Sequence, residues 1–202
     1  FLDVRERTDL DIAQLSRELG IDIAVDLMGF TQATRLRCFS YRCAPVQVSY
    51  LAYPGTIGAS YMDYVIADKV VIPPHAQADF TEKVVYLPHS YQVNDSQRKA
   101  ADRTFSRDEL GLPATGFVFC CFNNNFKILP PTFDGWMRIL HAVEGSVLWL
   151  LEDNPIAARN LRREAQARGI SADRLVFASR VPMDQHLARQ RMADLFLDTL
   201  PY

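Results

Sequence analysis

The clearest pattern in the chain is an uninterrupted apolar run at residues 117–122. A short apolar run without polar alternation predicts a strand that is buried on both faces of a parallel sheet. The run ends at three asparagines, residues 123–125, and Lys127 follows them. Pro130 and Pro131 then mark a helix start, because proline is tolerated in the first helical turn. The pattern therefore predicts a strand, a polar loop with a cation, and a helix.

The alternation of apolar strands and amphipathic helices continues to the end of the chain. Four apolar side chains recur at helical spacing and predict that the first of these helices buries one face. They are Phe133, Trp136, Met137 and Leu140. Further strands are predicted at 146–151, 175–178 and 195–197, and further helices at 156–168 and 183–192. Strands that alternate with helices indicate a parallel sheet with right-handed crossover connections.

The N-terminal half contains a second set of strands and helices. Strands are predicted at 21–27, 46–51, 62–68 and 83–87, and helices at 9–19 and 32–43. Residues 92–103 are polar and without periodicity, which predicts a linker, and a short helix is expected at 105–111. The expected fold class is α/β.

Composition and charge exclude several classes of function. The chain has 202 residues, of which 49% are hydrophobic and 23% charged, as is ordinary for a globular protein. The net charge of −2 provides no field that would attract nucleic acid or an anionic membrane. No apolar run reaches the length of about 18 residues that a membrane span requires. We therefore expect no nucleic-acid partner and no membrane partner.

The four cysteines indicate a reduced protein. Cys120 and Cys121 lie in the apolar run, where thiols behave as small hydrophobic groups, and neither Cys38 nor Cys43 forms a CxxC pair. We expect no disulfide framework, no zinc site and a cytoplasmic location. The chain also lacks GxGxxG after a strand and GxxxxGK(S/T), which argues against a dinucleotide site and a P-loop.

The loop at residues 123–127 is the strongest candidate for a ligand site. In an open α/β sheet, ligands bind at the carboxyl ends of the strands. A lysine beside free helix N–H groups at that position suits a phosphate. The alternative is a surface loop whose asparagines and lysine serve solubility alone, and these residues by themselves leave both interpretations open.

Three other features can be explained by a structural role about as well as, or better than, by a functional role. Asp9-Leu10-Asp11 matches the DxD pattern that binds metal in some sugar-nucleotide enzymes, but acidic residues are favoured in a first helical turn anyway. The loop at 52–60 contains two glycines and a proline, which suit either a ligand close to the backbone or a tight turn. His89 follows a predicted strand, where a hydrogen-bonded structural role is commoner than a functional one. We expect no metal site.

Several stretches together resemble one family over nearly the whole chain. They are IDIAVDLMGFT, RCAPVQVSYLAYPGTIGASYMDYVIAD, EKVVYLPHSY, FNNNFKI, SVLWLLEDN and DRLVFASRVPMDQHLARQRMADLFLDTLPY. The sequence is similar to the catalytic region of the O-linked N-acetylglucosamine transferase (SPINDLY-like) family of glycosyltransferases, whose GT-B fold consists of two Rossmann-like domains. The resemblance implies that residues 1–92 form the C-terminal part of the first, acceptor-side lobe. It implies that residues 93–202 form the N-terminal part of the second, donor-binding lobe.

The resemblance also implies which residues hold the donor, a nucleotide sugar. Lys127 matches the lysine that contacts the donor diphosphate, and it is the expected catalytic residue. Asn124 matches a position near the same diphosphate, and His186 matches a histidine near the nucleotide. No residue is identified as the general base.

The uracil-binding segment of the family matches Arg180, Val181 and Met183. Met183 stands where the animal enzyme has a lysine, so that side-chain contact is not carried over. Tyr202 falls just before the family's His-Thr-Thr segment, whose hydroxyls bind phosphate, and it completes the expected substrate-binding residues. The short segment between His89 and the apolar run resembles bacterial members, because the animal enzyme has a large insertion there.

The implied function is an inverting transfer of N-acetylglucosamine from UDP-GlcNAc to Ser or Thr of a protein acceptor, without a metal or other cofactor. Negative charge develops on the leaving UDP, and fixed positive charge from Lys127 would stabilise it. Two alternatives stay open: O-fucosyl transfer from GDP-fucose, and a non-catalytic relative that binds a nucleotide sugar or a protein. We expect this fragment alone to be inactive, and upstream tetratricopeptide repeats to recruit the acceptor in the full-length protein.

Overall fold

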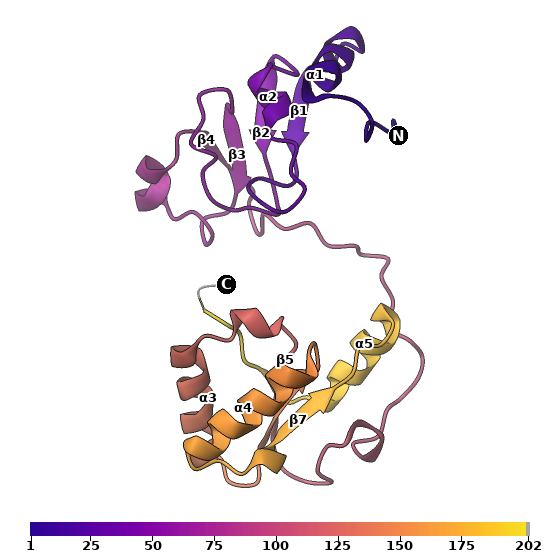
Figure 1. The fold of residues 1–202 in the computed structure, drawn as a ribbon, viewed down its shortest axis with the longest axis vertical. Coiled ribbons are helices and arrows are strands. Elements are labelled where there is room, and N and C mark those ends of the chain that lie inside the picture. The colour runs from indigo at the N-terminus through magenta and orange to yellow at the C-terminus, as the bar shows by residue number, and fades with distance from the viewer. Residues whose placement is uncertain (201–202) are drawn as a thin grey trace. The chain divides into compact units, whose positions relative to one another are not determined.

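The computed structural model describes residues 1–200, and the chain divides into two compact units, Phe1–Asp95 and Ser96–Tyr202 (Figure 1). The division falls after residue 95, close to the expected boundary after residue 92. Each unit contains one sheet of four parallel strands, which confirms the α/β class with two parallel sheets. The assignment of the units to an acceptor-side and a donor-binding lobe stays a prediction.

The first unit has the strand order β1-β2-β3-β4, and every neighbouring pair is parallel. Its elements are α1 (Asp9–Glu18), β1 (Ile23–Asp26), α2 (Arg37–Ser40), β2 (Val46–Ser49), β3 (Tyr64–Ala67), a 3-10 helix (Pro74–Asp79) and β4 (Lys83–Tyr86). The helices α1 and α2 pack on one face of this sheet. The buried residues of that core are Ala13, Leu36, Cys38, Phe39, Cys43, Ile57 and Met62.

The helix predicted at 32–43 is wrong in its extent, because α2 covers only Arg37–Ser40. Ala33 and Arg42 have positive φ angles of 63° and 57°. A left-handed backbone conformation at either position interrupts a right-handed helix. The Arg42 guanidinium instead holds neighbouring loops, donating to the carbonyl oxygens of Tyr61 at 2.9 Å and Pro45 at 2.8 Å.

The DxD sequence forms the start of α1. Thr8 Oγ1 accepts a hydrogen bond from the Asp11 N–H at 3.2 Å, and Asp11 Oδ2 accepts one from the Thr8 N–H at 3.1 Å. Asp9 Oδ1 accepts a hydrogen bond from Arg35 Nε at 2.6 Å. Both carboxylates therefore cap and brace the helix start. Within residues 1–200, no group of three or more His, Cys, Asp or Glu side chains is arranged to hold a metal ion.

The second unit has the strand order β7-β6-β5-β8, again with parallel pairs throughout. Its elements are β5 (Val118–Cys121), α3 (Pro130–Ala142), β6 (Val147–Leu151), α4 (Pro155–Ala167), β7 (Leu175–Ala178), α5 (Met183–Arg189) and β8 (Leu195–Phe196). Every residue of β5 and β6 is buried, which confirms the prediction of strands covered on both faces. The short helix expected at 105–111 is a 3-10 turn at Asp108–Leu110. Of the helices within residues 1–200, none has both the length and the apolar character needed to cross a bilayer.

Different segments cover the two faces of the second sheet. The helices α3 and α4 pack over one face, around Leu148 and Leu150. The other face packs against residues that precede β5 and residues that follow α5, among them Leu112 and Met192. The chain runs from β5 through β6 to β7 and then returns to add β8 on the far side of β5. This order matches the first four strands of a doubly wound fold and puts the switch point, where such folds bind ligands, between β5 and β8.

Candidate functional site

Asn123 ties together the two loops that meet at the switch point. Its Nδ2 donates to Asp198 Oδ1 and to Thr199 Oγ1, both at 2.9 Å, and these two residues follow β8. The loop that carries Asn124 and Lys127 is therefore anchored at the edge of the sheet where a ligand is expected. This anchoring role of Asn123 was not predicted, because its partners lie far along the chain.

Lys127 ends a 3-10 turn, Asn125–Lys127, between β5 and α3. Its N–H donates to the Asn124 carbonyl oxygen at 3.0 Å. Burial raises the pKa of the Cys121 thiol at the end of β5, and the positive charge of Lys127 is among the smaller effects that lower it. Lys127 therefore lies near the carboxyl end of β5, and its contact with an anion stays a prediction.

Fewer free helix N–H donors lie beside Lys127 than the sequence predicted. The first two residues of α3 are Pro130 and Pro131, which have no N–H. Phe133 donates its N–H to the Leu129 carbonyl oxygen at 3.0 Å. Among the described residues at this helix start, only the Thr132 N–H is left for a ligand. Positive charge at the site must therefore come mainly from side chains.

Arg180 joins loops that follow three neighbouring strands. Its Nη2 donates to Asp153 Oδ1, after β6, at 2.5 Å and lies 3.5 Å from Asn124 Oδ1, after β5. Two of the predicted residues, Arg180 and Asn124, are thereby brought together. The Arg180 side chain is 65% exposed. An exposed ion pair is weak, so an anionic ligand competes effectively with Asp153 for this guanidinium.

A pocket of about 270 Å³ lies beside Arg180. Its lining residues are Phe122, Leu151, Arg180, Val181, Met183, His186 and Arg189. Three predicted substrate-binding residues, Arg180, Val181 and His186, therefore surround one cavity. An apolar and aromatic lining with a few polar groups is typical of a small-molecule site.

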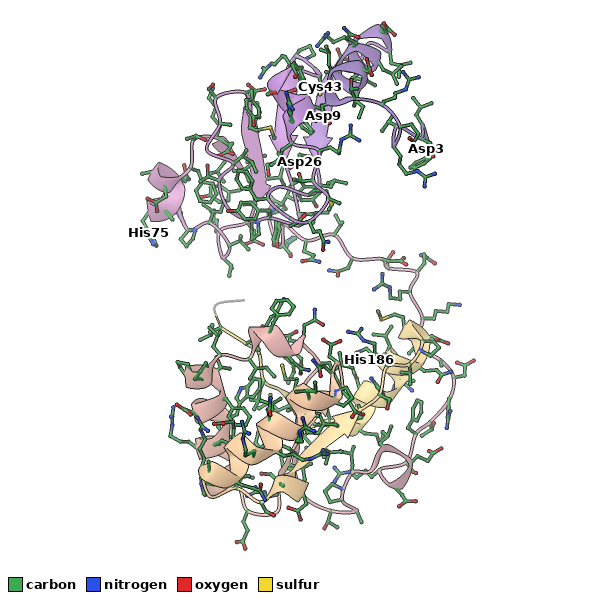
Figure 2. All side chains as sticks on the ribbon, viewed as in Figure 1. Asp3, Asp9, Asp26, Cys43, His75 and His186 are labelled. Atoms are coloured by element: carbon green, nitrogen blue, oxygen red, sulfur yellow. The ribbon has the colours of Figure 1, made fainter. Side chains whose placement is uncertain are left out.

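His186, labelled on α5 in Figure 2, is held by Arg189 one helical turn further on. Arg189 Nη2 and Nε lie 2.9 and 3.2 Å from His186 Nδ1. A guanidinium only donates hydrogen bonds, so Nδ1 accepts and the neutral ring carries its proton on Nε2. The side-chain amide of Gln190 is the partner of Nε2 at 3.0 Å, and its oxygen must face that proton. Burial lowers the pKa of His186, and the charge of Arg189 lowers it further. The ring is therefore kept neutral, with Nε2 as a hydrogen-bond donor.

Arg189 is a buried charge in this pocket, with only 3% of its surface exposed. Its Nη1 donates to the Ser179 carbonyl oxygen at 2.7 Å, and its guanidinium lies 5.3 Å from the ring centre of Phe122. Sequence reasoning missed Arg189, Phe122 and Asp153. The spacing of three residues between His186 and Arg189 was a usable signal, because residues three apart share a helix face.

The side chain of Asn125 lies in the same turn as Lys127. Its amide oxygen and nitrogen are both buried, and neither has a hydrogen-bond partner within the described residues. A buried amide without partners is costly, so a polar group bound in this loop would stabilise it. The last predicted residue, Tyr202, lies outside the described residues.

The loop at 52–60 is held by a carboxylate that immediately precedes β4. Glu82, only 4% exposed, accepts hydrogen bonds from Thr56 Oγ1 and from the Ile57 N–H, both at 2.6 Å. At the neighbouring Gly29, with a φ of +54°, an added Cβ would lie 2.3 Å from the Cβ of Tyr53. These contacts support the structural interpretation of the loop. His89 is exposed on this first unit.

Replacing Glu82 with alanine is expected to lower the free energy of unfolding of the first unit by about 2 kcal/mol, because the Ile57 N–H and the Thr56 hydroxyl lose a charged acceptor. Urea unfolding with a probe in this unit measures the change. Glu18→Ala, at an exposed position, is the control and is expected to change the unfolding free energy by less than about 0.5 kcal/mol. Equal effects of the two substitutions would show that Glu82 does not hold the loop.

Comparison with known proteins identifies the family of this site. The sequence model described as Glycosyl transferase family 41 matches residues 4–103 and 100–201. The chain is 37% identical, over 204 residues, to a probable UDP-N-acetylglucosamine-peptide N-acetylglucosaminyltransferase SEC of Arabidopsis thaliana, covering 98% of this chain and 21% of that protein. It is 32% identical, over 199 residues, to a probable UDP-N-acetylglucosamine-peptide N-acetylglucosaminyltransferase SPINDLY of Solanum lycopersicum, covering 95% of this chain and 21% of that protein.

A solved structure supports the same relationship. A mutant O-GlcNAc transferase of Thermobaculum terrenum superimposes with a TM-score of 0.86 at 34% identity, covering 99% of this chain and 38% of that chain. The match confirms the GT-B-like architecture expected from the sequence. The chain spans about a fifth of the length of the curated relatives described above. It belongs to glycosyl transferase family 41.

Proposed function

We propose that this chain carries the donor-binding region of an inverting glycosyltransferase that moves N-acetylglucosamine from UDP-GlcNAc to Ser or Thr of a protein acceptor. One observation carries the proposal: at the switch point of the second sheet, the Lys127 loop, Arg180 and the His186 pocket form one polar edge. The printed names of the Arabidopsis and tomato relatives, both UDP-N-acetylglucosamine-peptide transferases, support the same donor and acceptor.

In this proposal the pocket at His186 and Val181 receives the nucleobase. The ring of Phe122, whose centre lies 4.9 Å from that of His186, forms one wall. The Nε2–H of His186 exchanges its contact with the Gln190 side-chain amide, at 3.0 Å in this structure, for a carbonyl group of the ligand. A uracil presents such carbonyl acceptors. A neutral donor suits them better than a charged imidazolium, because burying a charge is costly.

The diphosphate of the donor lies against Lys127, Asn124 and Arg180 in this proposal. Breaking the bond to the sugar leaves negative charge on UDP, and a fixed ammonium group stabilises that charge more in the transition state than in the ground state. Arg180 exchanges Asp153 for a phosphate oxygen, and the Asn125 amide gains a polar partner. The proposed reaction uses these side chains and needs no metal ion.

The proposal also includes the partners and the cellular location of the protein. The relatives are about five times as long as this chain, which leaves room for upstream tetratricopeptide repeats that recruit the protein acceptor. All four cysteines, within the described part of the chain, are free and buried, which supports a reducing, cytoplasmic environment.

Calorimetric titration of the full-length protein with UDP and with GDP tests the proposal. We expect UDP to bind with a Kd below about 1 mM, in the range of ordinary substrate affinities, and GDP to bind at least about tenfold more weakly. A preference for GDP would support fucosyl transfer instead. Binding of neither nucleotide would overturn the assignment of a nucleotide-sugar donor.

A further inference from the structure

Aspartates lie at or just after the carboxyl ends of several strands, and one of them differs from the others in its partner. Asp26, Asp68 and Asp198 each accept a hydrogen bond from the backbone N–H of a nearby loop residue, at 2.7, 2.9 and 2.8 Å. A carboxylate that accepts a backbone N–H in this way stabilises a turn. Within the described residues, Asp153 accepts no backbone N–H, and its partner is the guanidinium of Arg180. The fold of its own loop therefore does not explain this carboxylate.

The start of α4 does not use Asp153 either. The next residue, Asn154, caps this helix, and its Oδ1 accepts hydrogen bonds from the Ile156 N–H at 2.8 Å and the Ala157 N–H at 3.4 Å. Asp153 Oδ1 instead lies 2.5 Å from Arg180 Nη2, and the Asp153 side chain is 31% exposed. Arg180 can therefore leave Asp153 for another group without the loss of a backbone hydrogen bond.

Asp153 competes with an anionic ligand for Arg180. In the proposed site a phosphate oxygen of the donor takes the guanidinium, and the Asp153 carboxylate then lies beside a second negative charge. Two like charges about 4 Å apart in a site open to water lower the affinity about fivefold. This loss grows with the charge of the ligand, whereas Lys127 and Arg180 attract a more highly charged ligand more strongly. Asp153 therefore opposes the cations of the site, and it does so most for the most negative ligand.

The proposed reaction increases the negative charge of the bound nucleotide. The bond between the anomeric carbon of the sugar and the β-phosphate oxygen breaks, and its electron pair stays on that oxygen. The acceptor hydroxyl oxygen forms the new bond to the anomeric carbon, and its proton is lost to solvent. The phosphate that becomes terminal has a second pKa of about 6, so UDP carries nearly one more negative charge than UDP-GlcNAc at neutral pH. The cations of the site alone would therefore hold the product more tightly than the donor.

We propose that Asp153 is a product-release residue, which weakens the binding of UDP more than the binding of UDP-GlcNAc. Its carboxylate retakes the Arg180 guanidinium as UDP leaves. The side chain acts through the charge at Arg180 rather than on the reacting bond, so its effect falls on the affinity and the dissociation rate of UDP. This inference rests on the proposed donor site and adds how the product leaves that site.

Replacing Asp153 with asparagine in the full-length protein tests this role, because asparagine keeps an oxygen acceptor for Arg180 and removes the negative charge. The Kd of UDP is expected to fall about tenfold and the Kd of UDP-GlcNAc about threefold, since UDP carries the larger charge. The dissociation rate of UDP should fall together with its Kd. Calorimetric titration with UDP and with UDP-GlcNAc measures both constants, and stopped-flow displacement of UDP measures the rate. Raising the ionic strength to about 1 M should remove most of the difference from the wild-type protein, because salt screens the repulsion.

Two further variants serve as controls. Asp173→Asn removes an exposed carboxylate that precedes β7, at the opposite edge of the same sheet, and it is expected to change neither Kd by more than about twofold. Asp153→Glu keeps the negative charge, so the ratio of the two Kd values is expected to stay within about twofold of the wild-type ratio.

The outcomes separate this inference from the proposed function. If the wild-type protein binds both nucleotides and Asp153→Asn leaves the ratio of their Kd values unchanged, the role of Asp153 is overturned and the proposed donor site stands. Weaker UDP binding in Asp153→Asn would show that Asp153 positions Arg180 for the ligand, and it would overturn the inference as well. Binding of neither nucleotide by the wild-type protein would overturn the proposed function, and this inference with it.

Discussion

Replacing Lys127 with alanine in the full-length protein is expected to lower kcat by about 10²- to 10³-fold, the loss typical of removing one preorganised group that stabilises developing charge. The α3 start supplies little compensation, since Pro130 and Pro131 have no N–H. The loss should appear in kcat more than in KM, because the charge on the leaving UDP is largest in the transition state. Initial rates of UDP release with a peptide acceptor measure both constants.

Two further substitutions make the Lys127 result specific. Lys99→Ala removes an exposed lysine of the linker and is expected to leave both constants unchanged within about twofold. Lys127→Arg keeps the charge but replaces a compact ammonium with a planar guanidinium, so partial activity is expected. If Lys127→Ala keeps the wild-type kcat, Lys127 has no role at the diphosphate. If it loses turnover but keeps acceptor binding, the protein is an enzyme rather than a binding module.

The sequence predicted the second unit well because its strands have a strong local signal. Apolar runs such as residues 117–122 mark buried strands without knowledge of their neighbours. The strand order was not predictable in the same way, because the pairing of β5 with β8 joins segments that are far apart in the chain. The loop at 123–127 was a candidate from sequence because it follows a predicted buried strand. The switch point beside it depends on the strand order, so that point and the anchoring by Asn123 emerged only from the fold.

Sequence reasoning failed where backbone conformation or a single side-chain geometry decides the structure. The helix predicted at 32–43 is cut short at Ala33 and Arg42, whose left-handed conformations no residue pattern announces. Arg189 was not singled out within the helix predicted at 183–192, although its guanidinium contacts His186. Charged residues at core-facing helical positions near a strand end are therefore worth testing as parts of a site.

Replacing the buried Arg189 with methionine is expected to change which nitrogen of His186 carries the proton and to weaken binding in the ligand pocket. In the wild-type chain, ¹⁵N spectra of the imidazole are expected to show one neutral form, protonated on Nε2, because Arg189 donates to Nδ1. In the variant both neutral forms should appear. UDP binding is expected to weaken about tenfold or more, since the Nε2–H donor is then only partly populated and the Ser179 carbonyl oxygen loses its partner.

The same variant should change the pH dependence of stability. Burial and the charge of Arg189 hold the pKa of His186 below its usual value, so on acidification the unfolded chain takes up this proton first. The neutral His186 therefore contributes to the free energy of unfolding at pH values above the ordinary histidine pKa of about 6.5. This contribution is lost as the pH falls from there through the folded-state pKa. Arg189→Met removes one of the two causes and should flatten this part of the profile, whereas His75→Gln, at an exposed position, should not.

Urea unfolding at a series of pH values between about 5 and 8, together with an NMR titration of His186, measures this difference. Arg189→Lys is the informative companion, because it keeps a buried cation but cannot reproduce the two-donor contact with Nδ1 and the bond to the Ser179 carbonyl oxygen together. If a cation alone matters, the lysine variant should keep the wild-type ring form. If the two-donor geometry of the guanidinium positions the ring, the lysine variant should have a ¹⁵N spectrum like that of the methionine variant. An unchanged spectrum in Arg189→Met would show that Arg189 does not position His186.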